Sequence, residues 1–125
     1  MKFLVLGAGA IGTYVGGSLA ARGEDVAFVE RPEVAEVIER RGLIVHRGKY
    51  TRTERRVRMY TSNADALAAG PYDACVFALK SFDTEAALDG LIATGHPVPP
   101  ILSLANGVDN EPAIAARLGA DGVIA

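Results

Sequence analysis

The sequence is poor in the residues that build disulfides and metal centres. Cys75 is the single cysteine in 125 residues, so an internal disulfide is excluded. The two histidines, His46 and His96, lie far apart in the sequence, and no cluster has the spacing of metal ligands. We therefore predict no metal site. A lone thiol is typical of a reducing compartment, and we expect a cytoplasmic protein.

The chain also lacks a charge excess and long apolar runs. Its 13 Lys and Arg oppose 15 Asp and Glu, for a formal net charge of −2. Nucleic-acid binders are usually clearly basic, so we expect no nucleic-acid partner. No apolar run approaches the roughly 20 residues that a membrane span needs, and the N-terminus lacks a signal-peptide cleavage pattern. We therefore expect no membrane partner.

What the sequence does contain is an alternation of strand-like and helical segments. Strands are predicted at residues 3–6, 25–30, 57–61, 73–79, 100–104 and 123–125. Helices are predicted at residues 11–22, from Pro32 to Gly42, at 64–69 with Asn63 as its cap, at 82–93 and at 111–118. The inward faces of three helices are predicted to carry Ile11, Val15, Leu19, then Val34, Val37, Ile38, then Ala86, Leu88, Ile92.

A β-hairpin is predicted to interrupt this alternation around residues 43–56. The segments 43–45 and 50–53 have strand character and flank a turn centred on Gly48. The whole pattern predicts an α/β fold with a Rossmann-type, doubly wound and mostly parallel sheet. Because the sequence ends inside its sixth predicted strand, we expect residues 1–125 to be one domain of a longer protein.

The first strand runs into a glycine-rich turn. Residues 7–12, G-A-G-A-I-G, fit the pattern G-x-G-x-x-G between a strand and a helix. Gly7 permits the tight turn, Gly9 lets a pyrophosphate approach the backbone, and Gly12 lets the helix pack closely. The other members of this phosphate loop are Ala8, Ala10 and Ile11. The free N–H groups and the dipole of the helix N-terminus favour an anion there, so the turn predicts dinucleotide binding.

The end of the second strand carries two residues with opposite implications. An acidic residue in this place binds the ribose hydroxyls and favours NAD, whereas an arginine accepts the 2′-phosphate of NADP. The sequence has Glu30 followed by Arg31. Their side chains are expected to point in different directions, because side chains alternate along a strand. From these residues alone, both cofactors remain possible.

Two more polar residues follow predicted strands at their carboxyl ends. Lys80 comes after the strand at 73–79 and Asn106 after the strand at 100–104. Ligands of open α/β sheets bind over these ends, so both residues are candidates for the nicotinamide half of the site. The alternatives are a surface lysine and an ordinary turn at Asn106 and Gly107. Cys75 is expected to be a buried, inert thiol.

Taken together, four segments resemble the ketopantoate reductase (2-dehydropantoate 2-reductase) family in its N-terminal domain. They are the glycine turn, V-E-R at 29–31, A-L-K at 78–80 and N-G-V-D-N-E at 106–111. The glycine turn is shared by many dehydrogenases, whereas the last two segments are much more specific. The resemblance covers essentially the whole chain.

The resemblance implies reduction of 2-dehydropantoate to pantoate with NADPH, a step of pantothenate and coenzyme A synthesis. Arg31 then matches the 2′-phosphate arginine, which favours NADP, and Glu30 is a departure from the pattern. Lys80 and Asn106 match residues on the nicotinamide side, with Asn106 also near the 2-oxo acid substrate. The family's catalytic lysine belongs to a C-terminal helical domain, so no catalytic residue is expected in these 125 residues. The full-length enzyme is expected to form a homodimer.

Two other functions remain open. One is a related 3-hydroxyacid or opine-type dehydrogenase, which more naturally has a lone acid after the second strand. The other is a non-catalytic, nucleotide-sensing Rossmann module, which has no need of Lys80 and Asn106 beside the nicotinamide.

Overall fold

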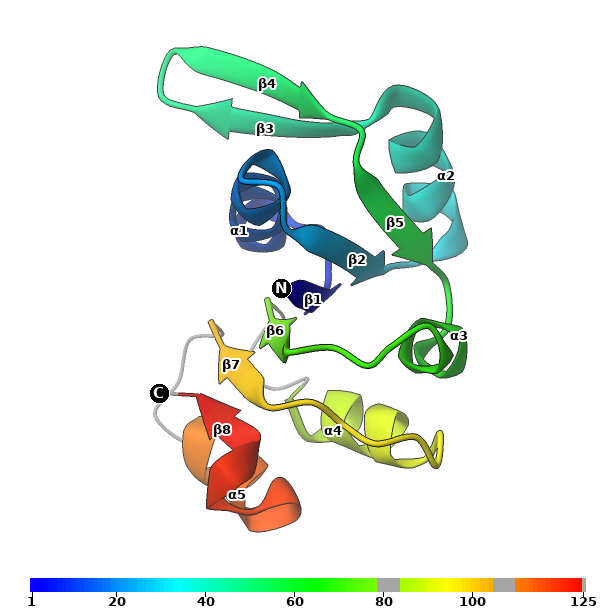
Figure 1. Ribbon diagram of the computed structural model, residues 1–125, viewed down its shortest axis with the longest axis vertical. Coiled ribbons are helices and arrows are strands. Elements are labelled where there is room, and N and C mark those ends of the chain that lie inside the picture. The colour runs from blue at the N-terminus through cyan, green and yellow to red at the C-terminus, as the bar shows by residue number, and fades with distance from the viewer. Residues whose placement is uncertain (79–83, 105–109, 125) are drawn as a thin grey trace.

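A computed structural model describes residues 1–78, 84–104 and 110–124 (Figure 1). Within them, one sheet contains the strands β1 (Lys2–Leu6), β2 (Asp25–Val29), β5 (Val57–Tyr60), β6 (Ala74–Phe77), β7 (Ile101–Ser103) and β8 (Val123–Ile124). The strand order is β5-β2-β1-β6-β7-β8, and every neighbouring pair is parallel. This is the order of a Rossmann sheet, so the predicted fold class is confirmed.

The inner strands β1, β2 and β6 are mostly apolar because both faces of the sheet are covered. Leu4 and Phe77 point to one hydrophobic cluster, while Val5, Phe28 and Val76 point to the other. A strand with both faces buried has no polar side, so its sequence reads as a continuous apolar run. That explains why the runs at β1, β2 and β6 were recognisable in the sequence.

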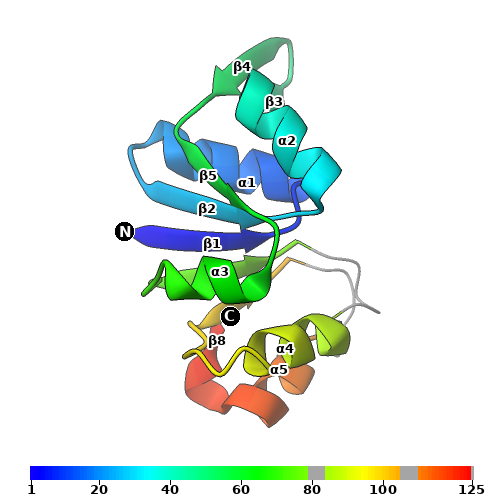
Figure 2. The same cartoon turned by 90° about the vertical axis from the view of Figure 1, so that its right-hand side faces the viewer.

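Helices form a layer on each face of the sheet (Figure 2). α1 (Ala10–Ala21) and α2 (Pro32–Arg41) cover the first face together with the hairpin. α3 (Asn63–Ala68), α4 (Thr84–Ile92) and α5 (Asn110–Leu118) cover the second, and a short 3₁₀ helix, η2 (Ala120–Gly122), leads into β8. No helix in the described ranges is long and apolar enough to cross a membrane.

The predicted hairpin is present as β3 (Leu43–Arg47) and β4 (Tyr50–Glu54), a separate antiparallel sheet. It lies over α1, where Val45 contacts the backbone at Gly17 so closely that an added Cβ would stand 2.4 Å from Val45 Cγ2. Leu43 is buried in the same cluster. The base of the hairpin is therefore part of the core, and its tip extends beyond it (Figure 1).

The predicted inward face of α1 is right for two residues and wrong for the third. Val15 and Leu19 pack against the core cluster, but Ile11 is 51% exposed. The fully buried residues of the helix are Gly12, Gly16, Gly17 and Ala20. The helix approaches the sheet so closely that the Phe28 ring fills the place of a side chain at Gly16, where an added Cβ would lie 2.4 Å from Cζ. Apolar periodicity misses such a face, because it is defined by missing side chains.

Three other helix predictions are wrong in part. In α2, Ile38 packs against the core as predicted, but Val37 is exposed and the fully buried residue is Ala35. In α4, Leu88 is buried as predicted, but its buried partners are Thr84 and Leu91, whereas Ala86 and Ile92 are exposed. The cap of α3 is Ser62, whose Oγ accepts the Asp65 N–H at 3.1 Å, so Asn63 is the first helical residue.

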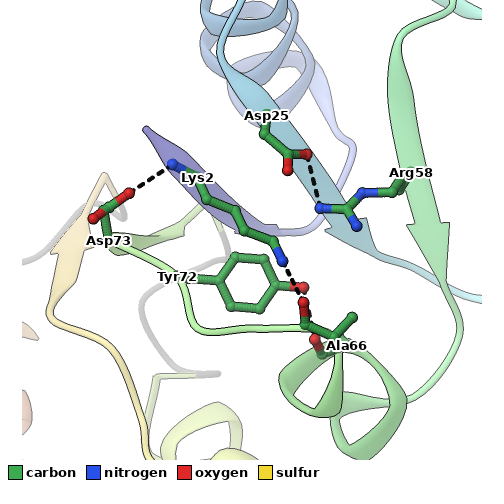
Figure 3. A network of polar contacts seen from close by, with 7 residues as sticks. Lys2, Asp25, Arg58, Ala66, Tyr72 and Asp73 are labelled. Carbon is green, nitrogen blue, oxygen red and sulfur yellow. Dashed lines mark hydrogen bonds and ion pairs between the residues drawn. The ribbon is translucent and has the colours of Figure 1, made fainter.

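Polar contacts fasten the sheet at the amino ends of its strands (Figure 3). The Lys2 N–H donates to Asp73 Oδ2 at 2.7 Å, and the Lys2 ammonium donates to the Ala69 carbonyl. The same ammonium lies 5.0 Å from the centre of the Tyr72 ring. Tyr72 donates its hydroxyl to the Ala66 carbonyl at 2.6 Å, and burial raises the pKa of this phenol to about 12.

A second pair at this end joins β5 to β2. Arg58 Nη2 lies 2.7 Å from Asp25 Oδ1, at the first residue of β2. Ligands of parallel α/β sheets bind over the opposite, carboxyl ends of the strands. These contacts therefore stabilise the sheet at the end opposite to the candidate site, which is sought at the carboxyl ends of the strands.

Candidate dinucleotide-binding site

Three chain segments leave the sheet side by side at its carboxyl edge. Leu6 is paired with Val29 on one side and with Phe77 on the other. The next residues, Gly7, Glu30 and Ala78, therefore meet at one place. The chain passes from β1 to β2 on one side and returns through β6 on the other, which makes this edge the topological switch point where such sheets bind ligands.

Gly7 and Gly12 shape the turn between β1 and α1. Gly7 has φ +96°, a conformation that side chains disfavour, and its N–H donates to the Val29 carbonyl at 3.2 Å. A Cβ added to Gly12 would lie 2.0 Å from the Gly7 oxygen and 3.2 Å from Ala78 Cβ. Both glycines are therefore required for the turn itself.

Gly9 has a different environment. It is the N-cap of α1 with φ −71°, and a Cβ added to it would meet no heavy atom within 4 Å. No side chain caps the helix, so the first N–H groups of α1, starting at Ala10 and Ile11, have no side-chain acceptor. Open space before an uncapped helix N-terminus suits an anionic group, so the turn fits a dinucleotide pyrophosphate.

Glu30 is tied to this turn. Its Oε2 accepts the Ala8 N–H at 2.8 Å, and its Oε1 accepts the Arg31 N–H at 2.9 Å. The side chain is only 16% exposed. The sequence indicated Glu30 as a possible ribose ligand but gave no sign of the contact with Ala8. That contact joins residues 22 positions apart and depends on the register between β1 and β2.

Arg31 points outward, with 73% of its side chain exposed. Its Nε lies 3.8 Å from Glu30 Oε1, and its Nη1 lies 3.6 Å from Glu33 Oε1. Exposed ion pairs of this kind contribute at most about 1 kcal/mol, so the guanidinium remains free to turn toward a stronger partner. A phosphate dianion is such a partner, because it accepts two charge-assisted hydrogen bonds from one guanidinium.

Lys80 and Asn106 lie outside the described residues, so their predicted positions remain predictions. The strands that lead to them do arrive together. The Ala78 N–H donates to the Leu6 carbonyl at 3.3 Å, and the Leu104 N–H donates to the Phe77 carbonyl at 2.8 Å. The last described residues before both candidates are thus neighbours at the edge that also carries the glycine turn.

Ser103 is a polar residue at this edge that the sequence argument missed. Its Oγ is the only buried side-chain oxygen or nitrogen without a hydrogen-bond partner in the described part of the chain. It occupies the last position of β7, opposite Phe77. The sequence does mark this position, because Ser103 is the one polar residue in the apolar run I-L-S-L at 101–104.

Cys75 lies within β6 and does not belong to the site. It is fully buried in the same hydrophobic cluster as Leu4 and Phe77, and burial raises the pKa of its thiol far above the usual value. Reactive cysteines instead have a lowered pKa and partial exposure. The predicted burial of this thiol is confirmed. In the described ranges no three His, Cys, Asp or Glu side chains gather as a metal site.

Comparison with known proteins gives one consistent family. The model of the family "Ketopantoate reductase PanE/ApbA" matches residues 3–125. A 2-dehydropantoate 2-reductase of Pyrococcus horikoshii is 34% identical over 111 residues, which are 89% of this chain and 35% of that protein. The crystal structure of 2-dehydropantoate 2-reductase from Geobacter metallireducens GS-15 superimposes with a TM-score of 0.83 at 33% identity, covering 98% of this chain and 40% of that one.

A more distant likeness concerns the fold alone. A D-mandelate dehydrogenase solved with NADH and anilino(oxo)acetate has a TM-score of 0.82 at 20% identity, covering 98% of this chain and 39% of that one. The chain spans about a third of the length of the curated relatives it matches. On the family match and these relatives, it belongs to the ketopantoate reductase PanE/ApbA family of oxidoreductases.

Proposed function

We propose that this domain binds NADP(H) and serves as the nucleotide-binding part of an enzyme that reduces 2-dehydropantoate to pantoate. The observation that carries the proposal is the open backbone at Gly9 together with the exposed guanidinium of Arg31, which follows the neighbouring strand β2. The first accepts a pyrophosphate, and the second accepts a 2′-phosphate. Membership of the ketopantoate reductase family supports the substrate and its place in pantothenate synthesis.

Each part of the site has a proposed role. The backbone of the turn from Gly7 to Gly12, with Ala8, Gly9, Ala10 and Ile11, holds the pyrophosphate. Arg31 holds the 2′-phosphate. Lys80 and Asn106 contact the nicotinamide side of the cofactor, and Asn106 also contacts the 2-oxo acid. The bound cofactor supplies a hydride for the carbonyl carbon of the substrate.

The remaining parts of the reaction are assigned to residues beyond this sequence. A carbonyl that receives a hydride must also receive a proton from an acid within hydrogen-bond reach. In the proposal this acid, a C-terminal helical domain and the homodimer contacts belong to the longer protein. The same proposal places the enzyme in the cytoplasm.

A second candidate is an NAD-linked dehydrogenase of a related 2-oxo or 3-hydroxy acid. The observation that favours it is the carboxylate of Glu30 at the end of β2, in the place where NAD enzymes hold the ribose hydroxyls. Both carboxylate oxygens of Glu30 also accept a backbone N–H, and each keeps a second lone pair for a ribose hydroxyl.

Turnover assays with two samples test the proposed reaction. The natural gene product that carries these residues is expected to oxidise NADPH when 2-dehydropantoate is added. The 125-residue chain is expected to bind NADPH without turning it over. Oxidation that depends on another 2-oxo acid and not on 2-dehydropantoate contradicts the substrate, and enzyme-like rates from the short chain contradict the division of roles.

A further inference from the structure

We infer that Glu30 is a positioning residue for the glycine turn and that its negative charge sets the strength of the NADPH preference. The inference rests on the proposed NADP(H) site. It gives Glu30 a positioning role in addition to the preference for NAD that an acidic residue in this place usually confers. The two effects depend on different properties of one side chain. Positioning requires an acceptor oxygen, whereas the cofactor preference depends on the charge.

The positioning role follows from how the Ala8 peptide units are held. The Ala8 N–H donates to Glu30 Oε2 at 2.8 Å, and the Ala8 carbonyl accepts the Thr13 hydroxyl at 2.9 Å. Ala8 is thus fastened at both ends, from β2 and from α1. It lies between Gly7 and Gly9, and glycine backbones have the greatest conformational freedom to lose when the turn becomes ordered. A turn already fixed in its binding shape loses less entropy when the pyrophosphate binds.

The charge role follows from the position of Arg31. Its Nε lies 3.8 Å from Glu30 Oε1, so a 2′-phosphate bound by this guanidinium also approaches the Glu30 carboxylate. Two like charges roughly 4 Å apart in water repel by about 1 kcal/mol, which corresponds to about a fivefold change in affinity. NADH has no 2′-phosphate and does not experience this repulsion. Glu30 therefore weakens NADPH binding relative to NADH binding.

Two substitutions separate the roles. Glu30→Gln keeps one acceptor oxygen for the Ala8 N–H, replaces the acceptor of the Arg31 N–H by an NH2 group and removes the charge. Glu30→Ala removes both acceptors and the charge. We expect Glu30→Gln to strengthen NADPH binding about fivefold and to leave NADH binding within about twofold. We expect Glu30→Ala to show the same ratio of NADPH affinity to NADH affinity as Glu30→Gln. Both affinities are expected to be about threefold to tenfold weaker than those of Glu30→Gln, because the acceptor for the Ala8 N–H is lost.

Hydrogen exchange of the Ala8 amide reads the contact without any cofactor. The amide is expected to exchange slowly in the wild type and in Glu30→Gln, and at least threefold faster in Glu30→Ala. Glu33→Gln is the matched control. The Glu33 carboxylate also lies near Arg31, with Oε1 3.6 Å from Nη1, but the Ala8 N–H donates to Glu30. This control substitution is expected to leave the exchange of Ala8 unchanged. If Glu30→Ala does not fold, Glu30→Met tests the loss of the acceptor at nearly constant side-chain length.

Each role has its own contradicting result. Equal Ala8 exchange in Glu30→Gln and the variants without an acceptor overturns the positioning role. An unchanged NADPH-to-NADH ratio in Glu30→Gln overturns the charge role. Failure of the wild type to bind either dinucleotide overturns the proposed function instead, and the amide exchange still decides whether Glu30 holds the turn.

Discussion

A Cβ added to Gly12 would stand 2.0 Å from the carbonyl oxygen of Gly7, whereas Gly9, in the same turn, has no neighbour within 4 Å of such an atom. At Gly12 the turn can fold only because the residue has no side chain. At Gly9 a side chain would fit, so the fold itself does not require glycine there. The two positions therefore separate the folding of the turn from its binding of a ligand.

Gly9→Val is expected to abolish measurable dinucleotide binding with little loss of fold. The valine side chain enters the open space needed by the pyrophosphate, and a poor N-cap costs the helix about 1 kcal/mol. Binding is measured by NADPH fluorescence titration and folding by thermal melts. The control is Gly12→Ala, which is expected to lower the melting temperature sharply. An unchanged dissociation constant in Gly9→Val contradicts a pyrophosphate at this turn.

Arg31→Ala is expected to weaken NADPH binding about tenfold and to leave NADH binding nearly unchanged. A direct guanidinium–phosphate bond contributes about 1.5–3 kcal/mol, and the neighbouring carboxylates reduce that gain. The matched control is Arg40→Ala, because Arg40 is an exposed arginine of α2, the helix that Arg31 precedes, and pairs with Glu36 at 3.8 Å. Equal losses for both cofactors in Arg31→Ala show that Arg31 does not recognise the 2′-phosphate.

Tyr72 is expected to make the domain sensitive to alkaline pH. Burial raises the pKa of Tyr72 to about 12, so the unfolded chain loses this proton first as the pH rises above about 10. The Tyr72 contribution to stability is present below pH 10 and is lost between about pH 10 and 12. Urea unfolding of the wild type and Tyr72→Phe across this range checks the prediction, and the difference in unfolding free energy should shrink as pH rises. A constant difference contradicts it.

Cys75 is expected to report on opening of the sheet. Because the thiol is fully buried and its pKa is raised, reagents reach it only when the structure opens. Labelling in native buffer should be much slower than in about 8 M urea, which unfolds most small domains. Saturating NADPH should slow it further, because a ligand of the folded state stabilises that state. Labelling at the rate of a free thiol in native buffer contradicts the buried position.

The sequence was informative where local pattern and burial agree. Val5 and Val76 belong to strands covered on both faces, so their continuous apolar runs predicted the parallel sheet. The hairpin was recognisable because Gly48 marks a turn between two short strands. The glycine part of the inner face of α1 was not recognisable, because Gly16 is buried where the Phe28 ring occupies the space of a side chain.

The role of Glu30 could not be predicted for a different reason. Its contact with Ala8 joins positions 22 residues apart and exists only because β1 and β2 pair in one register. Residue types at the end of a strand predict which ligands are possible there. They do not show which hydrogen bonds are already occupied within the protein.

Titration calorimetry of the 125-residue chain with NADPH and with NADH tests the NADP(H) site most directly. Both titrations use the same buffer and ionic strength, because phosphate contacts weaken as salt rises. The account predicts that both bind and that NADPH binds about tenfold more tightly, which corresponds to about 1.4 kcal/mol. Equal affinities, or tighter binding of NADH, would contradict an NADP(H) site built on Arg31.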